Sequence, residues 1–204
     1  MKYFIGVIVF AVVAVGGYYA WDFYKGIERA PEEPTVEEPV ITRYATSTFA
    51  IAYPDNFSLD DAYAYKGVPN KPIDGVKFTI PTAMTEGTNL ADDSGVSVEW
   101  LPRANICAGD IYVLDDVSAF DVTVGSTTYS VATTSGAGAG NLYEEQVFAI
   151  PESNPCTAVR YFIHTTNLAN YSPEEGESAE VREYDRAALL RAFDQIRNSL
   201  ELVQ

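Results

Sequence analysis

This chain of 204 residues has few of the residues on which catalysis most often depends. It contains two cysteines, Cys107 and Cys156, and one histidine, His164. The absence of a Cys-x-x-Cys pair argues against a dithiol redox site, and a zinc site would have to be built largely from carboxylates. No Gly-x-Ser-x-Gly sequence occurs, so the nucleophile elbow of the α/β-hydrolases is also excluded.

Positive charge is scarce as well. The chain has 13 lysines and arginines against 29 acidic residues, and its formal net charge is −16. Such a surface repels phosphate backbones, so nucleic acid is not expected as a partner. Paired aspartates such as Asp60-Asp61 and Asp92-Asp93 could attract Ca²⁺, but none has the spacing of a calcium loop, and we interpret them as solvated loops. No metal and no cofactor is predicted.

The residues from Tyr3 to Trp21 form a run without any charged side chain. At about 1.5 Å per residue, a helix of this length crosses a bilayer core of about 30 Å. Lys2 ahead of the run favours a cytoplasmic N-terminus and an extracytoplasmic domain. We predict a single-pass anchor in the cell membrane, because Tyr18 and Tyr19 stand where a cleavage site needs small residues. A cleaved signal peptide stays the alternative.

Three regions follow from this pattern. Residues 1–29 are the predicted anchor and its flank, and residues 30–42 are a Pro/Glu-rich linker whose prolines and repelling carboxylates favour an extended chain. Residues 43–204 are the predicted extracytoplasmic domain, since the chain is 47% hydrophobic, enough for one core. Outside the cytoplasm disulfides persist, so we predict that Cys107 and Cys156 form one.

Alternating apolar residues predict an antiparallel β-sheet, and a helical stripe follows it. Strands are expected at 49–53, 75–80, 95–101, 111–114, 120–124 and 127–133, whereas the Gly/Ala/Ser run 133–140 is interpreted as a flexible connection. Leu189, Phe193, Ile196 and Leu200 recur at spacings of three and four, which predicts a helix within 183–203. The predicted fold class is therefore α+β, an antiparallel sheet covered by a C-terminal helix and preceded by the transmembrane helix.

A β-hairpin is predicted over residues 141–166, with its turn at Pro151 to Pro155. If the turn centres on Ser153, Val147 pairs with Val159, Tyr143 with Ile163 and Gln146 with Arg160. One face of the hairpin is then mostly apolar and lies under the helix. The other carries Glu144, Gln146, Arg160 and His164, although a slip of one residue would exchange the faces that meet. Glu145, if buried, needs a tyrosine hydroxyl or Arg160 from a shifted register as its partner.

Two short segments resemble a known family. Tyr44, the strand Phe49-Ala50-Ile51-Ala52-Tyr53-Pro54 and Phe57 resemble the start of the PsbP-like group, which has the Mog1/PsbP-like α+β fold. Residues 193–200 resemble the closing helix of those domains. The resemblance implies an α+β domain that assists a larger assembly. The chain also resembles uncharacterised bacterial membrane-anchored proteins that consist of an anchor, a Pro/Glu linker and a small domain.

Two functions remain open at this point. The first is a membrane-anchored extracytoplasmic domain with a binding or accessory role and an envelope protein as partner. The second is an envelope hydrolase in which His164 is a general base, oriented by Glu144 and aimed by Arg160, because the predicted register sets all three on one face. An isolated histidine more often has a structural role, so these residues are candidates only and no catalytic residue is assigned.

Overall fold

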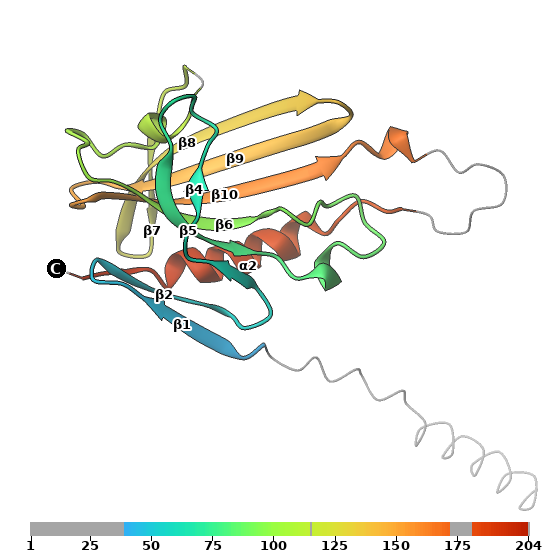
Figure 1. Ribbon diagram of the computed structural model, residues 1–204, viewed down its shortest axis with the longest axis horizontal. Helices are drawn as coiled ribbons and strands as arrows, with labels where there is room; N and C mark the ends of the chain where they lie inside the picture. Colours follow the sequence, from blue (N-terminus) through green and yellow to red (C-terminus); the bar gives the residue numbers. More distant parts are fainter. Residues whose placement is uncertain (1–38, 115, 172–180, 204) are drawn as a thin grey trace, which may run out of the picture. The chain divides into compact units, whose positions relative to one another are not determined.

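The computed structural model describes residues 39–114, 116–171 and 181–203, which belong to one compact unit, Pro39–Gln204 (Figure 1). The predicted membrane segment, Tyr3 to Trp21, lies outside these residues. Within the described ranges, no helix combines the length and the apolar character that a bilayer crossing requires. The first strand already begins at Ile41, inside the segment predicted as linker.

A large antiparallel sheet dominates the unit. Its strands, in spatial order, are β3 (Ser58–Asp60), β5 (Ile73–Thr79), β6 (Gly95–Leu101), β10 (Cys156–Thr166), β9 (Asn141–Ile150), β8 (Thr127–Gly138) and β7 (Phe120–Val124), and β4 (Ala64–Tyr65) pairs with β5. Neighbours in this order are antiparallel. Hairpins join β7, β8, β9 and β10 in sequence, so half of the sheet is a meander.

A smaller sheet and one α-helix complete the fold. The small sheet has the order β1 (Ile41–Ala45), β2 (Phe49–Pro54) and β11 (Glu201–Leu202), so it joins the two ends of the unit. The helix α2 (Arg186–Asn198) begins at the N-cap Asp185, whose side chain accepts a hydrogen bond from the backbone of Ala188. Three short 3₁₀ turns lie in the connections: η1 (Thr82–Met84), η2 (Gly109–Tyr112) and η3 (Leu168–Asn170).

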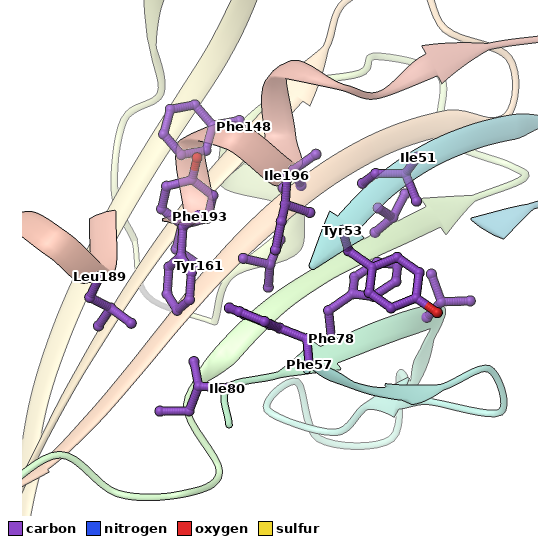
Figure 2. Packing of buried hydrophobic residues seen from close by; sticks show 14 of the residues in the cluster. Ile51, Tyr53, Phe57, Phe78, Ile80, Phe148, Tyr161, Leu189, Phe193 and Ile196 are labelled. Atoms are coloured by element: carbon purple, nitrogen blue, oxygen red, sulfur yellow. The ribbon is translucent and has the colours of Figure 1, made fainter. Parts of the chain in front are cut away.

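Helix α2 and strand β2 pack on the same face of the large sheet, which we call the helix-covered face. Phe193 of α2 contacts Tyr161 of β10, with ring centroids 5.3 Å apart, and Tyr53 of β2 contacts Phe78 of β5 at 4.6 Å (Figure 2). Burying aromatic side chains removes large apolar areas from water. This face therefore holds the larger of two hydrophobic clusters.

The opposite face, which we call the loop-covered face, lies partly under β4 and η2. Its cluster of buried residues is smaller: Ile73, Tyr112, Val113, Ala132, Val147, Ala149, Cys156 and Ala158. Cys107 and Cys156 form a disulfide at its edge, as predicted. The bond ties the loop before η2 to the start of β10.

The predicted α+β class is wrong. The described residues are mostly antiparallel β-sheet and contain a single α-helix, so this is a mainly β fold. One reason is that residues 133–138, predicted as a flexible connection, continue strand β8 and pair with β9. Backbone hydrogen bonds along a ladder need no side chains, and a run of small residues can therefore form a strand when a neighbour supplies the partners.

The predicted hairpin register is wrong by one residue. Arg160 pairs with Val147, Phe162 with Glu145 and His164 with Tyr143. Because side chains alternate along a strand, this slip moves every residue of β9 relative to β10 to the other face. Glu145 and His164 consequently share the loop-covered face.

Candidate functional site

Arg160 is fully buried at the centre of the loop-covered face. Its Nε and one terminal nitrogen donate to the two carboxylate oxygens of Glu99, each at 2.8 Å, and Glu99 is also fully buried. The other terminal nitrogen donates to Glu145. Burial lowers the pKa of Arg160, but the hydrogen bonds and charge of Glu99 outweigh it and hold the pKa above its ordinary value.

The ion cluster ends at a tyrosine lid. The ring of Tyr65 in β4 lies over the Arg160 guanidinium, with its centroid 3.5 Å from Cζ, and its hydroxyl donates to Glu145 at 2.9 Å. Burial raises the pKa of Tyr65 above the usual value, so the neutral phenol is favoured as a donor. Glu145 thus receives both partners that its burial requires, a tyrosine hydroxyl and Arg160.

Arg160 also fixes the 3₁₀ turn η2 above the sheet. It donates to the backbone carbonyl of Tyr112 at 2.8 Å, and the Tyr112 hydroxyl donates to the carbonyl of Cys156 at 2.7 Å. A Cβ atom on Gly109 would lie 2.6 Å from the Ala132 nitrogen, so the turn sits directly on β8 only because residue 109 is glycine. Ion cluster, tyrosine and disulfide together hold this loop in one place.

An apolar groove of about 770 Å³ opens beside the fixed loop. Its lining comes from the segment before β5, the end of β6, the following loop and η2: Lys71, Pro72, Leu101, Pro102, Arg103, Ala104, Asn105, Ile106 and Ile111. Ile106 is 74% exposed, although it is a large aliphatic residue. The volume falls in the range of about 300 to 1,000 Å³ that is typical of small-molecule sites.

The charges around the groove are of one sign. Lys71 and Arg103 line it, and no acidic side chain does. Neither cation forms a salt bridge within residues 39–114, 116–171 and 181–203. In the β5–β6 ladder, Gly75 pairs with Glu99, and continuing that register beyond the strand ends sets Lys71 across from Arg103. The two cations therefore lie at the same end of the groove.

His164 lies near the other end of the loop-covered face. Its Nδ1 is 2.7 Å from an Asp93 oxygen, and its ring stacks on Tyr143 with centroids 4.6 Å apart. Its Nε2 is buried and has no hydrogen-bond partner in the described part of the chain. A general base must bring a free nitrogen within hydrogen-bond reach of its substrate. The enclosed Nε2 does not offer that geometry.

The structure does not bring the three predicted candidates together. Glu144 lies on the helix-covered face, where its carboxylate binds Arg186 of α2 at 2.7 Å. Arg160 and His164 share a face but are four residues apart on β10, about 13 Å along a strand. The guanidinium of Arg160 is already bound to Glu99 and Glu145, so it is not free to aim a substrate.

Sequence reasoning missed both Glu99 and the groove. Glu99 alternates with Val98 and Trp100, a pattern that predicts a solvent-facing carboxylate, and no periodic signal marks its buried partner. The groove is lined mainly by loop residues, which have no periodicity at all. The exposed aliphatic Ile106 beside a cysteine was the one local signal that could have indicated it.

Comparison with known proteins adds little. No family model matches this chain, and no curated protein does. A crystal structure of a protein from Bacteroides thetaiotaomicron is similar with a TM-score of 0.42 and 13% identity, covering 76% of this chain and 45% of that chain. This chain therefore spans less than half of that protein. The likeness carries no argument about function, and the resemblance to the PsbP-like group stays a prediction.

Proposed function

We propose that this protein is an extracytoplasmic binding domain whose ligand occupies the apolar groove lined by Leu101, Ile106 and Ile111. The disulfide between Cys107 and Cys156 supports the location, because such bonds persist in oxidising compartments. Membrane attachment through residues 3–21 and an envelope protein partner stay predictions of the sequence.

The observation that carries this proposal is an open apolar groove with fixed walls. Three of its neighbours are anchored independently: the end of β6 pairs with β10, η2 hangs on Arg160, and the disulfide holds the loop between them. A pre-organised site loses less entropy when a ligand binds, so rigid walls favour affinity. A large exposed aliphatic side chain, Ile106, is also typical of a surface that acquires a partner.

The hydrolase alternative requires Glu144 to orient His164. These side chains point to opposite faces of the sheet, and Asp93 occupies Nδ1 while Nε2 is enclosed. No observation on the described residues favours this alternative, and binding is the function that we retain.

The test is photo-labelling of the full chain with a neutral alkyl probe, a diazirine-bearing dodecanol, followed by peptide mass spectrometry. We expect saturable labelling of residues 101–106 and 111, with competition by unlabelled dodecanol. Ile106→Asp should weaken that competition about tenfold, since it removes an apolar contact and adds a charge that must be desolvated.

Leu114→Asp is the matched control, because Leu114 is also an exposed aliphatic residue, at 63%, but does not line the groove. It should leave labelling unchanged. Labelling that does not saturate, or that Ile106→Asp leaves intact, would remove the groove as the binding site.

A further inference from the structure

The charge pattern of the groove indicates which ligand it takes. Only nine basic residues follow residue 43, against 23 acidic ones. Two of these nine, Lys71 and Arg103, line the most apolar part of the loop-covered face, where no acidic side chain accompanies them. In a chain of such negative charge, an anion is repelled from most of the surface but attracted here.

We propose that the groove binds a free single-chain carboxylate amphiphile, with its hydrocarbon tail along Leu101, Ile106 and Ile111 and its carboxylate on Arg103 and Lys71. This inference rests on the proposed function and names its ligand class. Arginine holds carboxylates through two parallel N–H donors, and lysine adds a point charge beside it. Both ends of such a ligand thus meet a complementary part of the groove.

The size of the groove separates this ligand from a protein surface. Nine residues line a space of about 770 Å³, whereas a stable protein interface involves about 20 to 30 residues on each side. A small molecule of which most of the surface is buried fits such a volume. The cations also make no salt bridge within the described ranges, so the ligand would not have to displace an internal carboxylate.

The test compares competitors against the neutral photo-probe at pH 8, where a carboxylate is ionised. Dodecanoate should compete at least about tenfold more strongly than dodecanol, since it adds a charged hydrogen bond, and dodecylamine should compete least. Arg103→Glu should abolish or reverse the preference for dodecanoate over dodecanol. Arg191→Glu makes the same charge change at an exposed arginine of α2 and should leave that preference intact.

Each result is decisive. If dodecanoate competes no better than dodecanol, or if Arg103→Glu behaves like Arg191→Glu, the carboxylate preference is wrong while the groove remains a binding site. Stronger competition by an acidic, leucine-containing peptide would replace the amphiphile with a peptide ligand. Stronger competition by phosphatidylglycerol vesicles would replace it with a membrane lipid. If no competitor reduces labelling at all, the proposed function fails together with its ligand.

Discussion

Two buried arginines show how differently the faces of the sheet are stabilised. Arg160 on the loop-covered face binds Glu99, and both side chains are fully buried. Arg197 of α2, on the helix-covered face, binds Asp194 at 3.0 Å, but the Asp194 side chain is 46% exposed. The guanidinium of Arg197 lies over the ring of Phe148, 4.4 Å from its centroid. One arginine depends on a desolvated partner, and the other keeps a hydrated one.

The difference teaches what each face is suited for. The helix-covered face is stabilised mainly by apolar area, and its contacts can adjust because hydrophobic burial is not directional. The loop-covered face has a smaller apolar cluster, and directional bonds from Arg160 and the disulfide fix η2 over it. Directional bonds position a loop closely, as a binding groove requires.

Arg160→Met should have the largest effect on stability. It leaves the Glu99 carboxylate buried without a partner, which costs about 3 to 5 kcal/mol of unfolding free energy. Arg197→Met is the matched variant. It should cost about 1 to 2 kcal/mol, because Asp194 remains hydrated and only a partly exposed pair and a cation–π contact are lost. Urea denaturation of both variants measures the difference.

The double variant Arg160→Met/Glu99→Leu sharpens this comparison. Replacing a buried ion pair with apolar residues of similar size is often neutral for stability, so it should recover most of the loss. Binding in the groove should recover less, because the bond from Arg160 to the Tyr112 carbonyl is still missing. Equal losses for the two single arginine variants would contradict the distinction between the faces.

Removing the disulfide should have the next largest effect. For a sequence separation of 49 residues, the chain-entropy model gives a loss of about 4 kcal/mol. Cys107→Ala/Cys156→Ala should expose η2 first, since the bond and Tyr112 both act on that loop. Hydrogen exchange is the measurement: amides of 101–112 should lose protection by a larger factor than those of α2. Uniform loss across both faces would show that the bond acts only on the unfolded chain.

High pH should have a smaller, graded effect. Burial raises the pKa values of Tyr65 and Tyr112 on the loop-covered face and of Tyr161 on the helix-covered face. The folded chain then keeps protons that the unfolded chain loses above about pH 10. Their contribution to stability is therefore complete below about pH 10 and is lost as the pH rises further. Urea denaturation between pH 8 and 11 should show this decline, and Tyr161→Phe should make it less steep.

The sequence predicted some of these elements well and others poorly, for identifiable reasons. The stripe Leu189, Phe193 and Ile196 is the buried face of α2, because helical spacing is a strong signal in an amphipathic segment. The hairpin register failed because alternation fits two registers equally well when a five-residue turn separates the strands. Glu145 contained the correction, since its burial needed Arg160, and only the observed register supplies it.

The groove could not have been predicted in the same way. Its residues are distant in sequence, and they meet because η2 is fixed by Arg160 and the disulfide. A buried pair such as Arg160 and Glu99 arises from strands that meet only in the fold. Patterns within one segment carry no information on such contacts.

The central claim is that ligands bind to the loop-covered face, and methyl chemical-shift mapping tests it most directly. Dodecanoate should be titrated into the full chain with labelled isoleucine and leucine methyl groups. We predict saturable shifts at Leu101, Ile106 and Ile111, with Leu189 and Ile196 under α2 unmoved. Saturable shifts confined to Leu189 and Ile196, or no saturable shift at any methyl group, would contradict the claim.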